Sequence, residues 1–118
     1  MTAQLKSTLD KYIGHISQVN GVSQIYLFGS HALGTSDGKS DIDLLITVDD
    51  KLDPIKVAHK IQMDLSEMDT LSNASFEEIL HEPALDIIVN RKTAFEKASK
   101  EHFFQREVIK TGVLLYGE

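Results

Sequence analysis

Hydrophobic positions near the start of the chain recur at the three- and four-residue spacing of a helix face. They are Leu5, Leu9, Tyr12, Ile13, Ile16 and Val19. This spacing predicts a helix over residues 3–19, which Asn20-Gly21 would end. The following segment, residues 22–28, is rich in β-branched and aromatic side chains and predicts a strand.

The middle of the chain alternates between turn-forming and apolar segments. Gly29-Ser30 forms a turn, residues 31–33 a short helical piece and residues 34–39 a loop with two glycines. Residues 42–48 predict a second strand. Asp53-Pro54 is an N-cap followed by proline at the first helical position, which predicts a helix to about residue 70. Its expected inward side chains are Ile55, Ala58, Ile61, Leu65 and Met68.

The last third of the chain predicts one more strand and more helix. Residues 71–82 leave two possibilities open, a helical turn begun by a capping box or irregular structure. Residues 85–89 predict a third strand. Thr93 with Glu96 is expected to begin a helix that runs through Phe103 and Phe104 and ends at Gly112, before a last short strand over 113–116. This order of elements predicts an α+β, or mixed α/β, fold.

Length and composition limit the kinds of protein that this chain can be. Its 118 residues suit one domain, 1–118, and the absence of cysteine excludes disulfides and thiolate metal sites. The start lacks the apolar core of a signal peptide, and no apolar run approaches a membrane span, so we expect a cytoplasmic protein without a membrane partner. The net charge of −6 opposes binding to nucleic acid, although a metal ion could still bring in a single nucleotide.

Asp41 and Asp43 are the first candidates for chemistry. Because the side-chain period of a strand is two, both carboxylates project from one face and can reach one cation cluster. An Asp-x-Asp pattern is common by chance, but this one opens an apolar strand and follows Gly29-Ser30 after ten residues. The glycine permits close backbone approach and the serine offers a hydroxyl, which together suit a phosphate, although such a pair is more often an ordinary turn and N-cap.

Residues 29–43 resemble the Gly-Ser, ten residues, Asp-x-Asp signature of the DNA polymerase beta-like nucleotidyltransferase superfamily. Ala32, Gly34 and Ser40 also match the usual form of this signature, and the resemblance covers residues from about 22 to 90. It implies the fold of that superfamily, a small mixed sheet flanked by helices. It also implies a third carboxylate on a neighbouring strand, for which Asp86 is the candidate.

The resemblance implies a reaction at these residues. Asp41, Asp43 and Asp86 would bind Mg²⁺ and form the catalytic group, with Asp86 on the acceptor side, while ATP provides the transferred nucleotide. Gly29 and Ser30 would hold its phosphates.

The turn after Gly-Ser departs from the family pattern. Where the family commonly has arginine this chain has Leu33, which leaves His31 and Lys39 as the nearby nucleotide-binding residues. His31 could instead be plain helix surface.

Within the superfamily the chain resembles the minimal nucleotidyltransferases, or MNT proteins, which act as antitoxins to partners with a HEPN domain. This implies transfer of AMP to a hydroxyl acceptor, expected to be a tyrosine of such a partner, within a homo- or hetero-oligomer. One alternative is an antitoxin with a weak or inactive nucleotide site that acts by direct contact. Transfer to a small molecule such as an antibiotic is the less favoured third hypothesis.

Overall fold

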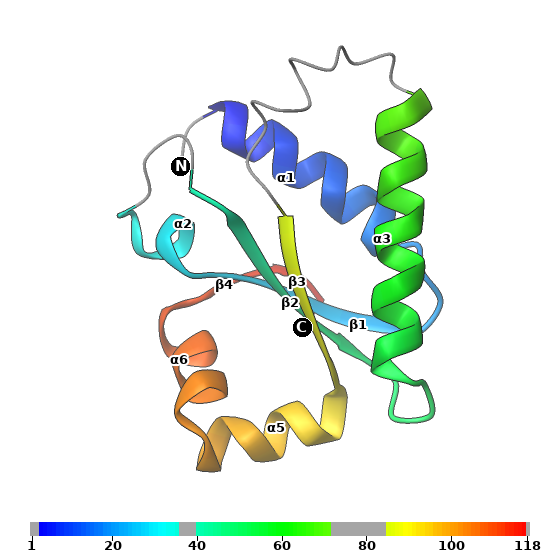
Figure 1. Cartoon of the computed structure of the whole chain (residues 1–118). Helices are drawn as coiled ribbons and strands as arrows, with labels where there is room; N and C mark the ends of the chain where they lie inside the picture. Colours follow the sequence, from blue (N-terminus) through cyan, green and yellow to red (C-terminus); the bar gives the residue numbers. More distant parts are fainter. Residues whose placement is uncertain (1–2, 36–39, 72–84, 118) are drawn as a thin grey trace.

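The computed structural model describes residues 3–35, 40–71 and 85–117 (Figure 1). The elements, in chain order, are α1 (Ala3–Ile16), β1 (Val22–Phe28), α2 (Ser30–Leu33), β2 (Ile42–Val48), α3 (Pro54–Leu71), β3 (Leu85–Arg91), α5 (Lys92–Glu101), α6 (Phe103–Thr111) and β4 (Val113–Tyr116). None of the helices in these three ranges is both long and apolar enough to cross a membrane.

The four strands form one mixed sheet in the order β3-β2-β1-β4. β1 is antiparallel to both β2 and β4, and β2 is parallel to β3. A parallel neighbour requires a long crossover, which contains α3 in this chain. The predicted mixed α/β class is confirmed, including the short last strand.

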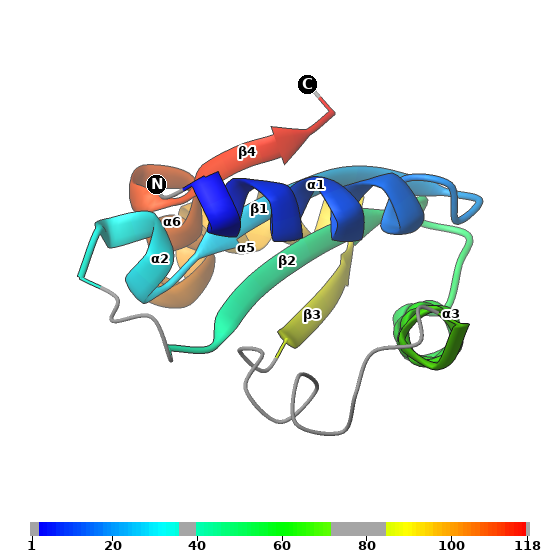
Figure 2. The ribbon, with the colours of Figure 1, turned by 90° about the horizontal axis from the view of Figure 1, so that it is seen from above.

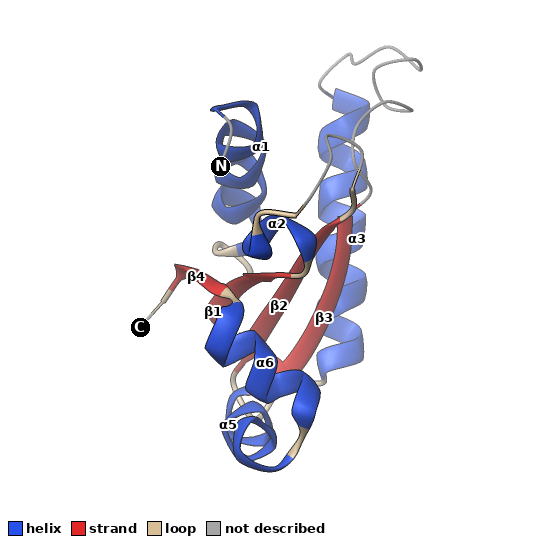
Figure 3. Ribbon diagram, turned by 90° about the vertical axis from the view of Figure 1, so that its left-hand side faces the viewer, coloured by secondary structure: helices blue, strands red, loops and turns tan. Residues whose placement is uncertain are grey.

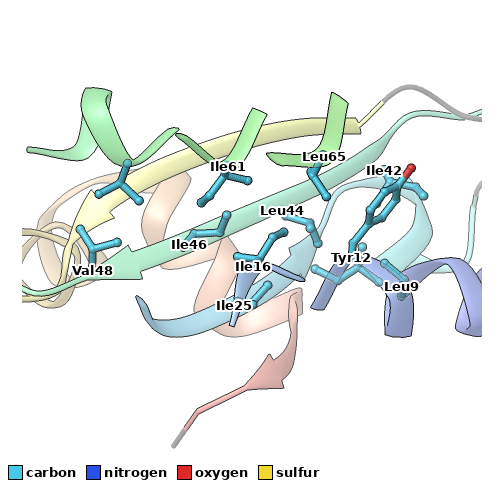
Figure 4. Close-up of a cluster of buried hydrophobic side chains, with 12 residues drawn as sticks. Leu9, Tyr12, Ile16, Ile25, Ile42, Leu44, Ile46, Val48, Ile61 and Leu65 are labelled. Atoms are coloured by element: carbon cyan, nitrogen blue, oxygen red, sulfur yellow. The ribbon is translucent and has the colours of Figure 1, made fainter. Parts of the chain in front are cut away.

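Helices cover both faces of this sheet. α1 and α3 lie on one face, and α5 and α6 lie on the other (Figures 2 and 3). Alternate side chains of β2 pack against α1 and α3, and they are Ile42, Leu44, Ile46 and Val48 (Figure 4). Leu45 points the other way and packs with Phe95 of α5 and Val108 of α6. The alternation therefore places Asp43 on the face that carries α5 and α6.

Two expectations for the first helices need correction. α1 ends at Ile16, and turns follow to residue 21, although Val19 still packs against the core. Among the α3 side chains that the structure describes, Val57, Ile61 and Leu65 are buried, whereas Ile55 is 80% exposed. The predicted inward side chain of Met68 lies outside this description. Ile55 lies in the first turn beside the N-cap Asp53, whose Oδ1 accepts the Ile55 backbone N–H at 2.9 Å, as the predicted cap requires.

The end of the chain contains two helices where one was predicted. α5 begins at Lys92, and no side chain caps it locally; Thr93 instead donates its backbone N–H to Asp50 at 3.0 Å. His102 has extended backbone angles and separates α5 from α6. The two possibilities for residues 71–82 lie outside the described residues, apart from Leu71 at the end of α3.

Candidate active site

The sheet brings Asp43 and Asp86 side by side. They are direct partners in the parallel pairing of β2 with β3, which places their Cα atoms roughly 4.8 Å apart. The pKa of Asp43 is raised, first by burial, then by the negative charges of Asp86 and Asp41, while His31 lowers it. The charges of two carboxylates thus act on Asp43 at the beginning of these two strands.

Asp41 lies directly before β2 and is exposed, as is Asp86. The charge of Asp41 is among those that raise the pKa of Asp43. In the three described ranges no three His, Cys, Asp or Glu side chains already form a metal-binding group. Mg²⁺ is usually held by one or two carboxylates together with substrate phosphates and water. The Asp43–Asp86 pair supplies oxygen ligands of that kind, so the donor set fits the ion.

Gly29 lies against the carboxylate of Asp43. Its backbone angles, φ 79° and ψ −156°, belong to a region that is essentially restricted to glycine. A Cβ atom at this position would collide with Oδ2 of Asp43 and lie 3.3 Å from its Cγ. Glycine at residue 29 therefore allows the turn after β1 to pass directly beside the acidic group.

Ser30 begins α2 immediately after that turn. The backbone N–H groups of Ala32 and Leu33 both donate to the Gly29 carbonyl oxygen at 3.1 Å, and Gly34 ends the helix in the left-handed conformation. This short helix fixes the position of Ser30 beside Gly29. The serine hydroxyl is consequently held near the turn that contacts Asp43.

The surroundings of His31, Leu33 and Lys39, the other residues that the sequence singled out near this turn, differ from one another. Nε2 of His31 lies 2.9 Å from the carbonyl oxygen of Ser40. Nδ1 of His31 is buried and has no hydrogen-bond partner among the residues that the structure describes. Leu33 is 57% exposed. Lys39 lies outside the described residues.

An aromatic pair that no sequence motif marks lies beside Asp43. Phe28 is the β1 partner of Asp43, and its ring meets that of Phe104 edge-on, with centroids 5.3 Å apart. Phe28 and Phe104 are far apart in sequence, and no periodic pattern connects them. Together they form an apolar boundary on the β1 side of Asp43, opposite Asp86 on β3.

Comparison with known proteins identifies the family that shares this arrangement. The model of the family described as polymerase beta, nucleotidyltransferase matches residues 10–118. No protein of curated function matches the chain significantly.

Solved structures share the fold at low sequence identity. A protein from Sulfolobus solfataricus assigned as a nucleotidyltransferase has a TM-score of 0.58 at 16% identity, over 98% of this chain and 82% of that one. A toxin–antitoxin protein crystallised with AMP-PNP has a TM-score of 0.53 at 22% identity, over 96% and 73%. A mutant of the toxin–antitoxin pair MntA–HpeT has a TM-score of 0.54 at 21% identity, over 96% and 72%.

Proposed function

The chain belongs to the polymerase beta nucleotidyltransferase family, and on that premise we propose that it transfers AMP from ATP to a hydroxyl group of a partner protein. The observation that carries this proposal is the pairing of Asp43 with Asp86 on adjacent strands, with Gly29 against Asp43. A carboxylate pair beside a glycine turn can hold a metal-bound triphosphate between them. Without a cation between the two carboxylates, burial and the like charge of Asp86 raise the pKa of Asp43 and oppose its ionisation.

Each residue of the site has a proposed role. Asp43, Asp41 and Asp86 hold Mg²⁺, which when bound neutralises negative charge on the reacting phosphate oxygens. Gly29 and the Ser30 hydroxyl bind the terminal phosphates, so that pyrophosphate leaves on their side. Asp86 is exposed and lies on the far side of Asp43 from the turn, where it can accept the proton of an incoming hydroxyl.

The acceptor in this proposal is a protein, by analogy with the toxin–antitoxin proteins that share the fold. One of these was crystallised with AMP-PNP, an ATP analogue. The resemblance of the Gly-Ser and Asp-x-Asp signature to that of MNT proteins leads us to propose a tyrosine of a HEPN-domain toxin as the acceptor, and this chain as the antitoxin. The open positions of Asp86 and Ile88 on β3 leave room for another protein to approach the acidic pair.

The test is the intact mass of a co-expressed HEPN-domain partner after incubation with ATP and Mg²⁺. We expect the mass to rise by one or more AMP units with the natural chain and with Asp64→Asn, a control on the exposed part of α3. Asp43→Asn should abolish the gain. An unchanged mass with a correctly folded pair would contradict transfer to this partner.

The exposure of Leu33 favours a second candidate function. This side chain is 57% exposed where the family commonly has a basic residue, so it adds no charge for the phosphates. A chain with a weak nucleotide site could neutralise its partner by contact alone. Full neutralisation of the toxin by Asp43→Asn, without any AMP on the partner, would establish this alternative.

A further inference from the structure

We infer that His31 is a positioning residue that holds Asp41 in place through the carbonyl oxygen of Ser40. The inference deepens the proposed function, since Asp41 is one of the residues proposed to hold Mg²⁺. It differs from the phosphate contact that the sequence suggested for His31. The two roles use different nitrogens of the same ring and can be separated by experiment.

The contact joins the turn to the segment that carries the acidic residues. Nε2 of His31 lies 2.9 Å from the Ser40 oxygen, across nine positions of sequence. A carbonyl oxygen only accepts hydrogen bonds, so Nε2 must carry the proton and donate it. The carbonyl group of Ser40 and the amide of Asp41 belong to one planar peptide unit. Fixing that oxygen therefore fixes the start of Asp41.

Asp41 lies just before the paired part of β2. The pairing of β2 begins at Ile42 with β3 and at Asp43 with β1, so Asp41 lies outside the described ladder. Its side chain is exposed. The His31 contact ties the peptide before Asp41 to the segment that follows the glycine turn.

The second nitrogen argues against a direct phosphate contact. Nδ1 is the ring nitrogen that remains for a phosphate, because Nε2 already donates to the Ser40 carbonyl oxygen. Nδ1 is buried, so water or phosphate in bulk solvent does not reach it. A phosphate ligand at Nδ1 would need an open approach, which the described residues around this atom do not leave.

Two matched substitutions distinguish the roles. The amide nitrogen of glutamine can occupy the place of Nε2, whereas that of asparagine is too short and mimics Nδ1. His31→Gln should therefore keep the link to Ser40, and His31→Asn should lose it. The first readout is backbone dynamics of the free protein by ¹⁵N relaxation. In His31→Asn the order parameter of Asp41 should fall below about 0.6, while in the natural chain and in His31→Gln it stays near about 0.85.

The second readout is the affinity for ATP, measured by calorimetry with Mg²⁺ and again with EDTA. Since the link acts through a metal-holding residue, His31→Asn should weaken binding roughly tenfold with Mg²⁺ and leave binding in EDTA unchanged. His31→Gln should stay close to the natural chain in both.

Three results would overturn the inference. These are an Asp41 that is equally ordered in both variants, an ATP affinity that falls equally with and without Mg²⁺, and a His31→Gln variant that is weaker than His31→Asn. If the natural chain binds no ATP, the proposed function fails, but the order parameter of Asp41 still decides the role of His31.

Discussion

Asp43, which is proposed to hold Mg²⁺, lowers the stability of the metal-free folded protein. Its pKa is raised because burial and the neighbouring carboxylates of Asp86 and Asp41 disfavour its charged form. Above the raised pKa the ionised group destabilises the metal-free fold, and below the ordinary aspartate pKa it is protonated in both states and has no effect.

We therefore expect Asp43→Asn to stabilise the metal-free protein at neutral pH while abolishing transfer. The gain should be roughly 0.5 kcal/mol, because the group is half-exposed and solvent screens it. Urea unfolding at several pH values measures it, and the gain should vanish as the pH falls below the ordinary range of aspartate. Asp10→Asn, on the exposed part of α1, serves as the control, and a loss of stability in Asp43→Asn would contradict the argument.

Gly29 and Gly34 provide a matched pair for the close approach to Asp43. Both have positive φ, but a Cβ on Gly29 would strike the Asp43 carboxylate, whereas a Cβ on Gly34 would meet nothing within 4 Å. Gly34→Ala should cost about 1 kcal/mol from backbone strain alone. Gly29→Ala should cost about 1–3 kcal/mol from its glycine-only conformation and also remove nucleotide binding, because Asp43 must move. Equal ATP affinity in the two variants would show that the approach of Gly29 is unimportant.

The sequence indicates which residues are candidates for the site, but not which of them contact one another. The spacing from Gly29 to Asp43, and the family resemblance that it carries, selected the candidate residues, and Asp86 was chosen as the lone charge in an apolar run. The register that makes Asp43 and Asp86 partners depends on strand pairing, which no local pattern specifies. The link from His31 to Ser40 depends on how the intervening loop folds back.

Among the elements, α5 is attached to the rest of the molecule at its first turn. Asp50, after β2, accepts both the backbone N–H and the hydroxyl of Thr93. These two hydrogen bonds lower the pKa of Asp50, helped by the charges of Arg91 and Lys92. An acceptor from elsewhere in the chain thus does the work of a helix cap.

Asp50→Ala should loosen the start of α5. We expect faster amide hydrogen exchange at Thr93 and a melting temperature lower by a few degrees at neutral pH. Because the folded-state pKa is lowered, the contribution of Asp50 is present above the ordinary aspartate pKa and is lost as the pH falls through the lowered value. Lys51→Ala, at the exposed neighbouring residue, is the control; unchanged exchange at Thr93 in Asp50→Ala would exclude this capping role.

Most elements could be predicted because the spacing of apolar residues and the positions of turn-forming and capping residues indicate the same boundaries. Proline at residue 54 and the serial apolar positions of α1 are local signals, and the structure has helices at both places. The cap of α5 could not be found, since its acceptor is 43 positions away. The break at His102 has no glycine or proline to mark it. It lies between Phe95 of α5 and Val108 of α6, which both pack in one cluster with Leu45 of the sheet.

For the molecule as a whole, the two faces of the sheet differ in how they are held. The face under α1 and α3 has the larger buried cluster, whereas the described hydrophobic cluster of buried residues on the other face consists of Leu45, Phe95 and Val108. Tyr26 packs against the Phe95 ring, with centroids 5.5 Å apart. Phe95, which is 2% exposed, is therefore the main anchor of α5 on the sheet.

Phe95→Ala should destabilise the protein by about 3–5 kcal/mol, measured by chemical denaturation. Phe103→Ala is the matched control, because that ring is 75% exposed and its loss should change stability by no more than about 0.5 kcal/mol. A mild effect of Phe95→Ala would mean that α5 is held chiefly by Asp50.

The strand order and the assignment of helices to faces, on which this prediction depends, could not be obtained from hydrophobic patterns. Such patterns show which side chains share a face, but not which other element packs against that face.

The alternation along β2 also limits how this gene can change in length. Ile42 and Leu44 face one layer while Asp43 faces the other, so deleting or inserting one residue inside the strand would exchange carboxylate and core positions beyond that point. Length variation among descendants of this chain should therefore avoid the strand, and lineages that lose or gain a residue within it should lose the fold and the acidic group together.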